Sequence, residues 1–292
     1  MSLLSNLKSL FKGSGRVDIS QRFELLKEAI SGTMSKFYMA RDRKDDRIVG
    51  LKILDAEKTA ALEQRFRGLK KPSEGEIALK LVHPNIVQTY EHGTTTRGEQ
   101  FLVMEYLNGP GLNSMLVAKS PLLNGRRVTI LRQTAEALAE IHRLGFIHRD
   151  ICPRNIVVDR ACETVKLIDF GLTVPDTPPF RQPGIRTGTP NYMAPEVVRR
   201  RSTSKLIDVF SFGVTAYEIC TNDLPWPRGA TGMDAMKHGI MEPNDIRKFR
   251  PGINETLARA IHECLDPNSH SRLDSLQQFL TLIEGIEHED AS

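Results

Sequence analysis

Apolar and polar residues alternate along the first third of the chain and recur at helical spacing along much of the rest. Short runs such as FELLKEAI, KFYMARD and IVGLKIL place apolar residues at alternate positions or in brief clusters, which is typical of β-strands. Residues 127–144 instead repeat apolar side chains every three or four positions, which indicates a helix with one buried face. The pattern predicts a strand-rich first part and a helix-rich second part.

Three features divide the strand-rich part. Residues 59–82 have helical spacing, and a His-Pro-Asn turn at 83–85 follows them. Residues 86–91 and 100–106 resume the strand pattern, and we expect them to complete a small antiparallel sheet. The Asn-Gly-Pro-Gly turn at 108–111 marks the expected boundary between the two parts.

The first twelve residues, MSLLSNLKSLFK, gather Leu and Phe side chains on one helical face and polar side chains on the other. Two hypotheses fit this segment: a surface anchor that contacts a membrane or a partner weakly, or a helix packed on its own domain. We favour the second, because a single amphipathic helix binds bilayers weakly. Gly13 and Gly15 belong to a linker, so residues 1–20 form one N-terminal segment.

Composition narrows the setting of the protein. The formal charge of +4 comes from 40 basic and 36 acidic residues that are well mixed, so nothing requires a nucleic acid partner. The four cysteines form no CxxC pair and the eight histidines no HExxH motif, which favours reduced thiols over a disulfide framework or a zinc site. No apolar run approaches the length of a membrane span. We expect a soluble, cytoplasmic and monomeric protein.

The strongest chemical signal is the segment HRDICPRNIVVDRACETVKLIDFG at residues 148–171. It holds Asp150, then Asn155 five residues later, and Asp169 before Phe-Gly, with two short strand-like runs in between. Phosphoryl transfer needs a carboxylate that orients the attacking hydroxyl, and oxygen ligands for Mg²⁺ beside the phosphates. Asp150 fits the first role, and Asn155 and Asp169 fit the second.

These HRD-x-x-x-x-N and DFG motifs resemble those of the protein kinases, and further motifs follow in the order of that family. The Gly-Thr-Pro and Ala-Pro-Glu tripeptides at 188–190 and 194–196 resemble those of Ser/Thr kinases. The resemblance covers nearly the whole chain and implies an α+β, two-lobed protein-kinase-like fold. A small, mainly antiparallel β lobe would span residues 21–107 and a large, mainly helical lobe residues 108–286, before a polar tail at 287–292.

The resemblance also implies a site for ATP and Mg²⁺ between the lobes. Lys52 matches the strand lysine that contacts the α- and β-phosphates, and family spacing selects Glu74 as its carboxylate partner, with Glu76 as the alternative. Around the adenine, the resemblance places Met104, the carbonyl of Glu105, the amide of Leu107, and Val157.

Two departures from the family pattern concern the nucleotide. The usual G-x-G-x-x-G loop becomes Ile30, Gly32 and Ser35, so we expect a stiffer loop with a weaker hold on phosphate. Phe37 stands where the family usually has Val, and Gly50 where it usually has Ala, both over the adenine ring. We hypothesise that the larger Phe37 takes the volume that Gly50 releases.

A third departure lies in the catalytic loop, where Cys152 replaces the lysine that Ser/Thr kinases place near the γ-phosphate. Arg154 matches the position from which tyrosine kinases supply an arginine for the same task, and a cation is needed because charge develops on the transferred group. We assign Arg154 as the replacement; the alternative is a solvent-exposed loop arginine. For Cys152, a space-filling role is favoured over a reactive thiol.

Further matches concern the substrate and its regulation. Asp208 matches the helix acid that braces the catalytic loop, and Arg272 matches the arginine that pairs with Glu196. Arg149, directly before the catalytic aspartate, suggests a fold that reads a phosphate on the following activation segment, although an ordered and unmodified segment is equally compatible. The candidate phosphorylation sites are Thr173, Thr177 and Thr187.

Together these features favour a kinase that transfers the γ-phosphate of ATP to Ser or Thr hydroxyls of protein substrates. The alternative is a non-catalytic kinase-fold binding module. The eroded glycine loop and Cys152 favour that alternative. The retained functional residues disfavour it, namely Lys52, Glu74, Asp150, Asn155 and Asp169. In the resemblance, the segment with the Gly-Thr-Pro and Ala-Pro-Glu tripeptides forms a platform for the protein substrate. Kinases of small molecules generally lack this platform, so its presence disfavours that class.

Overall fold

The structure is a computed structural model that describes residues 15–31, 34–229 and 234–291. The helix predicted at residues 1–12 and Gly32 of the phosphate loop lie outside these ranges. Within them, no helix combines the length and the apolar character needed to cross a bilayer.

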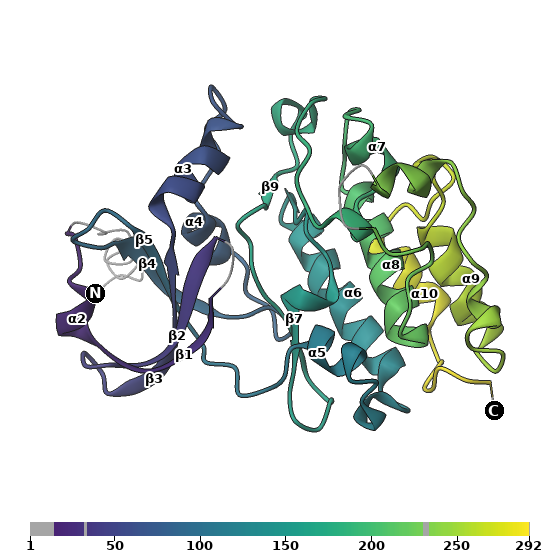
Figure 1. The fold of residues 1–292 in the computed structure, drawn as a ribbon, viewed down its shortest axis with the longest axis horizontal. Helices are drawn as coiled ribbons and strands as arrows, with labels where there is room; N and C mark the ends of the chain where they lie inside the picture. Colours follow the sequence, from purple (N-terminus) through teal and green to yellow (C-terminus); the bar gives the residue numbers. More distant parts are fainter. Residues whose placement is uncertain (1–14, 32–33, 230–233, 292) are drawn as a thin grey trace, which may run out of the picture. The chain divides into compact units, whose positions relative to one another are not determined.

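The described chain forms two compact units (Figure 1). The small unit contains the residues up to Lys80 together with Gln88–Leu107, and the large unit contains Leu81–Val87 together with the residues from Asn108 onward. The small unit is built on an antiparallel sheet and the large unit is mainly helical. The predicted α+β, two-part fold is therefore confirmed.

One five-stranded antiparallel sheet organises the small unit, with the strand order β1-β2-β3-β5-β4. A short helix, α2, precedes it and ends at the first strand. The alternating apolar residues of the strands meet in a buried cluster of Phe23, Ala40, Val49, Leu51, Phe101 and Val103. The elements are α2 Ile19–Arg22, β1 Phe23–Ser31, β2 Ser35–Asp42, β3 Arg47–Leu54, β4 Thr89–Thr94 and β5 Gln100–Met104.

One row across this sheet carries residues of the predicted site. Phe37 of β2 pairs with Lys52 of β3, Lys52 pairs with Leu102 of β5, and Leu102 pairs with His92 of β4. Directly paired residues of antiparallel strands project their side chains from the same face of the sheet. The row therefore lines up Phe37, Lys52 and His92 on one face.

The prediction of a continuous helix over residues 59–82 is wrong. The structure has two helices, α3 over Ala56–Gln64 and α4 over Glu74–Ala78. Between them Gly68 takes a positive φ of 85°, and Pro72 stands directly before Ser73, the N-cap of α4. A left-handed glycine and a proline both interrupt helical hydrogen bonding, whereas periodicity alone does not register either effect.

The strand predicted at residues 86–91 begins three residues later, at Thr89. Ile86 and Val87 belong to the large unit, where Val87 donates its backbone N–H to Leu167. These two residues are apolar because they are buried in the large unit. The periodicity of the sequence does not distinguish this burial from burial in the sheet of the small unit.

The large unit packs around helix α8, Leu206–Thr221, in which every residue from Ile207 to Cys220 is buried. Such a helix is apolar all round because neighbouring elements cover each of its faces. The other long helices are amphipathic, as predicted for residues 127–144. The helices of this unit, besides α8, are α5 Leu112–Val117, α6 Arg127–Arg143, α7 Pro195–Val198, α9 Glu255–Cys264 and α10 Leu276–Leu282.

Short strands and 3-10 turns position residues 148–171, which carry the HRD and DFG motifs, and the loops of the large unit. The hairpin of β7 and β8 carries the two strand-like runs that the sequence predicted. The strands are β6 Phe146–Ile147, β7 Ile156–Val158, β8 Val165–Leu167 and β9 Val174–Pro175. The turns are η1 Pro121–Leu123, η2 Pro153–Asn155, η3 Pro178–Arg181, η4 Pro190–Tyr192, η5 Asp234–Gly239 and η6 Ile246–Lys248.

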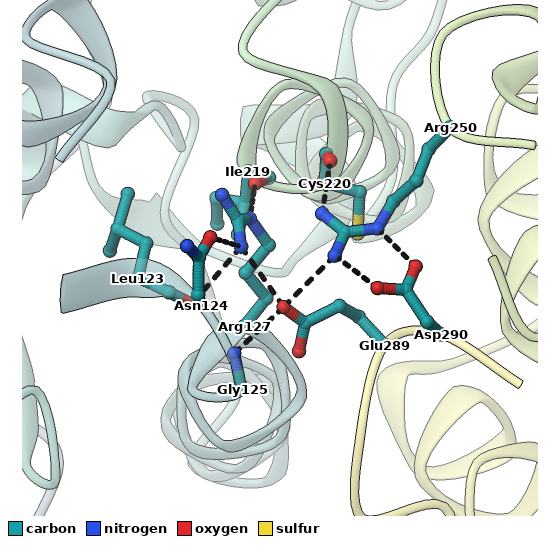
Figure 2. Close-up of polar contacts among 9 residues, drawn as sticks. All are labelled: Leu123, Asn124, Gly125, Arg127, Ile219, Cys220, Arg250, Glu289 and Asp290. Carbon is teal, nitrogen blue, oxygen red and sulfur yellow. Dashed lines mark hydrogen bonds and ion pairs between the residues drawn. The ribbon is translucent and has the colours of Figure 1, made fainter. Parts of the chain in front are cut away.

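The polar segment near the C-terminus is packed into the large unit. Figure 2 shows the guanidinium groups of Arg127 and Arg250 converging on the carboxylate of Glu289. The Nη1 of Arg127 lies 2.9 Å from Glu289 Oε1, and the backbone N–H of Gly125 donates to the same oxygen at 2.9 Å. Glu289 is only 2% exposed, so its polar character does not place it in solvent.

The same two arginines also hold the C-terminal end of α8. Arg127 donates through Nε to the carbonyl of Ile219, and Arg250 through Nη1 to the carbonyl of Cys220 (Figure 2). These carbonyls lie in the last turn of the helix, where no helical N–H follows to satisfy them. Glu289 and Asp290 together thereby balance the charge of the two cations that cap the central helix.

We predict that Glu289→Ala lowers the free energy of unfolding by about 3 kcal/mol, because it leaves the buried Arg127 without its carboxylate. Asp290→Ala is the matched control. Its side chain is 51% exposed in its pair with Arg250, so the loss should stay within about 1 kcal/mol. Urea unfolding of both variants measures the difference, and equal losses would contradict the prediction.

Candidate active site

The small unit brings Lys52 and Glu74 together. Lys52 Nζ lies 2.6 Å from Glu74 Oε1, and the two residues are 8% and 7% exposed. At this distance and burial the contact is a charge-assisted hydrogen bond, shielded from most of the solvent. Of the two acids that the sequence proposed as partners of Lys52, Glu74 is the one that the structure places there.

Glu76 has a different task, at the beginning of α4. Its carboxylate accepts the backbone N–H of Ser73 at 2.8 Å, while the Ser73 hydroxyl faces the backbone N–H of Glu76. This reciprocal arrangement is a capping box, which satisfies N–H groups at the beginning of the helix. Hydrogen bonds from Ser73 accordingly hold the pKa of Glu76 below its usual value.

Phe37 and Gly50 are close neighbours on adjacent strands. A Cβ at Gly50 would lie 2.7 Å from Phe37 Cζ, 3.1 Å from Met104 Cγ and 3.2 Å from the carbonyl oxygen of Glu105. The first of these distances is far shorter than the separation of two carbon atoms in van der Waals contact. The ring of Phe37 therefore stands where a methyl group at position 50 would have to go, which supports the hypothesis that the two residues compensate in volume.

Glu105 is tied to the neighbouring chain through Gln88. The backbone N–H of Glu105 donates to the Gln88 carbonyl at 2.9 Å, and its side chain accepts the Gln88 N–H at 2.8 Å. The resemblance assigns residues 105–107 to the adenine edge. The hydrogen bonds with Gln88 hold the first of them, Glu105, in place. Leu107, the last of them, is half-buried.

The large unit assembles the catalytic loop around Asp150. Thr189 donates both its hydroxyl, at 2.8 Å, and its backbone N–H, at 2.9 Å, to Asp150 Oδ1. Asn155 donates its amide to the backbone carbonyl of Asp150 at 2.7 Å and to Oδ2 at 3.1 Å. Both carboxylate oxygens are therefore fixed in direction by neutral donors.

Arg154 joins the same cluster through Thr189. Its Nη2 lies 3.1 Å from the Thr189 hydroxyl, which in turn donates to Asp150. Arg154 is exposed, so its guanidinium lies at the surface of the catalytic loop rather than in the interior. This position is compatible with the assignment of Arg154 to the transferred phosphate.

Cys152 is buried beneath this cluster. It is 1% exposed, and burial raises the pKa of its thiol to about 11. A thiol that remains protonated at neutral pH is a poor nucleophile. The structure therefore supports a space-filling role for Cys152.

Asn155 and Asp169 lie at the same end of the β7–β8 hairpin. Asn155 directly precedes β7 and Asp169 follows β8, and the N–H of Ile168 donates to the carbonyl of Asn155 at 2.9 Å. Since the amide nitrogen of Asn155 is bound to Asp150, its amide oxygen is the atom that remains for a cation. An amide oxygen and a carboxylate fit Mg²⁺, which takes the rest of its ligands from phosphate and water. Val157, half-buried within β7, pairs with Lys166.

Asp208 braces the backbone of the catalytic loop. Its carboxylate is fully buried and accepts the N–H groups of His148 at 2.7 Å and Arg149 at 2.8 Å. His142 Nε2 lies 2.9 Å from the same carboxylate and must be a donor, because a carboxylate only accepts. Burial alone would raise the pKa of Asp208, but these hydrogen bonds keep it below its usual value. The sequence analysis did not identify His142, because its contact with Asp208 joins residues that are 66 positions apart in the chain.

The three threonines proposed for phosphorylation differ in access. Thr173 is fully buried and its hydroxyl lies 3.5 Å from the carbonyl of His148, and Thr187 is 7% exposed. Thr177 is exposed. In this conformation, therefore, only Thr177 of the three presents its hydroxyl to solvent. Arg149 donates to the carbonyl of Ile185, within the same segment, at 3.3 Å.

The Ala-Pro-Glu platform is held by a buried ion pair. Arg272, whose side chain is 0% exposed, donates to Glu196 at 2.9 Å and to the Leu206 carbonyl at 2.7 Å. Arg272 thus links the end of the activation segment to the beginning of α8, as the sequence predicted for the Glu196 pair.

Comparison with known proteins agrees with this geometry. The chain matches the protein kinase domain family over residues 23–281 and belongs to that family. It is 32% identical over 273 residues to the serine/threonine-protein kinase pkn3 of Myxococcus xanthus, which covers 88% of this chain and 48% of that protein.

Other relatives carry the same description. The identity is 30% over 246 residues to the serine/threonine-protein kinase PrkC of Bacillus subtilis, with 83% of this chain and 37% of that protein covered. It is 33% over 234 residues to the serine/threonine-protein kinase PknA of Mycobacterium tuberculosis, with 78% and 53% covered. The chain thus spans about half the length of these relatives, or less.

We predict that Gly50→Ala weakens binding of Mg²⁺ and ATP, because the new methyl group displaces the Phe37 ring by which the resemblance roofs the adenine. The double variant Gly50→Ala with Phe37→Val restores the pair that is common in the family and should recover affinity. Isothermal titration with ATP measures both effects. An unchanged affinity in the single variant would show that the two positions are not coupled.

Proposed function

We propose that this chain is a Ser/Thr protein kinase that transfers the γ-phosphate of ATP to protein substrates. The observation that carries this proposal is the contact of Thr189 with Asp150, which joins the Gly-Thr-Pro segment of the substrate platform to the catalytic carboxylate. The printed names of the relatives, all Ser/Thr protein kinases, support the same specificity.

Each group of residues has a part in this reaction. Asp150 orients the acceptor hydroxyl and accepts its proton while the hydroxyl oxygen forms a bond to the γ-phosphorus; the bond from this phosphorus to the bridging oxygen breaks and leaves ADP. The paired Lys52 binds the α- and β-phosphates, and Arg154 offsets the charge on the transferred group. Asn155 and Asp169 would hold Mg²⁺, which supplies positive charge beside the β- and γ-phosphates.

A non-catalytic binding module of the same fold is the second candidate. The sequence of the phosphate loop, with Ile30 and Ser35 in place of two glycines, favours it. Against it stand the formed pair of Lys52 and Glu74, which positions a lysine for the phosphates, and the oriented carboxylate of Asp150, which nucleotide binding alone would not require.

The setting of the protein is part of the proposal. The structure leaves Cys152, Cys162, Cys220 and Cys264 as free and buried thiols, which fits a reducing compartment such as the cytoplasm. The monomeric state, and the weak contact of residues 1–12 with a membrane or partner, stay predictions.

The deciding experiment incubates the purified chain with Mg²⁺, labelled ATP and a generic basic protein, beside Asp150→Ala. We expect incorporation of phosphate on Ser and Thr in the unmodified chain and a loss of about a thousandfold in the variant, because the hydroxyl is no longer oriented. Phosphoamino-acid analysis identifies the acceptor. Binding of ATP without any transfer would favour the binding module, and phosphotyrosine alone would refute the Ser/Thr assignment.

A separate variant tests the cation of the catalytic loop. Arg154→Ala should lower kcat by about a hundredfold while KM for ATP changes little, because the arginine acts on charge that develops during transfer. Arg160→Ala, an exposed arginine after β7, is the matched control and should behave like the unmodified chain. An unchanged kcat in Arg154→Ala would show that this arginine is a solvent-exposed loop residue.

A further inference from the structure

Gly75 of helix α4 lies unusually close to His92 of β4. A Cβ at Gly75 would stand 2.4 Å from both Cβ and Cγ of His92 and 2.8 Å from its Nδ1. The backbone of Gly75 is helical, with no positive φ that would demand glycine. The reason for glycine at this position is therefore the contact with the histidine ring and not the backbone conformation.

This contact is next to the ion pair of Lys52 and Glu74. Glu74 and Gly75 are successive residues of α4, while Lys52 and His92 lie in the same row on one face of the sheet. The helix thus rests on the row at two points. Glu74 reaches Lys52 on β3, and the backbone of Gly75 meets the ring of His92 on β4.

We propose that His92 is a positioning residue that sets the place of α4 on the sheet, through Gly75, and so holds Glu74 within reach of Lys52. This inference concerns a contact inside the small unit and rests on the proposed function only for its effect on turnover. His92 itself does not touch the ion pair in this role; it acts through the backbone of the helix.

The distances show why a small shift matters. Ordinary van der Waals contact begins near 3.4 Å, so an alanine at position 75 would move α4 away from His92 by about 1 Å. The hydrogen bond from Lys52 to Glu74 is 2.6 Å long, and a lengthening of about 1 Å takes it out of hydrogen-bond range. Helix α4 has five residues, so little of its length can absorb the strain.

A role for the charge of His92 is the competing explanation, since its ring also lies near the carboxylate of Glu76. That carboxylate is already held by Ser73, in hydrogen bonds of 2.8 and 2.9 Å that form the capping box. The shape of the ring, which fills the space over Gly75, is the feature that the capping box does not supply.

The test compares four variants of the full chain: Gly75→Ala, His92→Phe, His92→Gly and Gly15→Ala. His92→Gly removes the whole side chain, because His92 Cβ is itself 2.4 Å from the position of a Gly75 Cβ and is therefore part of the contact. Gly15→Ala is the matched control, because no atom lies within 4 Å of the Cβ that it adds.

The first readout is the rate at which acetic anhydride labels Lys52, followed by mass spectrometry and normalised to exposed lysines. An ion-paired and buried amine reacts slowly, so we expect Gly75→Ala to raise the labelling rate severalfold. His92→Gly should raise the labelling rate as well, because the ring no longer sets the place of the helix, whereas His92→Phe and Gly15→Ala should match the unmodified rate. An unchanged rate in Gly75→Ala or in His92→Gly, or a raised rate in His92→Phe, would each overturn the proposal.

The second readout is turnover with Mg²⁺ and ATP, which separates this inference from the proposed function. Gly75→Ala should lower kcat by about a hundredfold, as expected for a misplacement of about 1 Å, and His92→Gly should lower it as well, whereas His92→Phe should not. If the unmodified chain transfers no phosphate, the labelling still decides the inference. If it transfers phosphate and Gly75→Ala does so equally well, the inference fails while the function stands.

Discussion

A single buried carboxylate, that of Asp208, fixes the geometry on which the catalytic loop depends. A charge removed from water is stable only when donors surround it, and the donors here are the backbone of His148, the backbone of Arg149 and the ring of His142. Arg149 has a positive φ of 72°, which is unfavourable for a residue with a side chain. The carboxylate stabilises this conformation, and Asp150 follows directly from it.

Cations play the corresponding part at the other end of the same helix. Arg127 and Arg250 donate to the last carbonyls of α8, and the carboxylates of Glu289 and Asp290 together balance the charge of these two cations. The central helix is therefore fixed by ionic groups at both ends and by apolar contacts between them. Since Asp208 is in its first turn, the placement of the whole helix governs the placement of the catalytic loop.

Sequence reasoning grouped the residues whose positions depend on local spacing. The separation of Asp150, Asn155 and Asp169 follows from a loop and a hairpin that leave little freedom, so the motif alone sufficed to group them. It did not find His142, Gly75 or His92, because their contacts join distant segments and depend on backbone positions that periodicity does not encode. It also extended one helix through Gly68 and Pro72, since apolar spacing continues where hydrogen bonding stops.

The contact of Phe37 with Gly50 also makes the two positions depend on each other. A phenylalanine at 37 beside an alanine at 50 would place carbon atoms 2.7 Å apart unless the ring moves, whereas valine beside glycine leaves only a small gap. The effect of a substitution at one position therefore depends on the residue at the other, and the free-energy changes of the two substitutions should not add. In this small unit the two residues vary as one pair rather than as two independent positions.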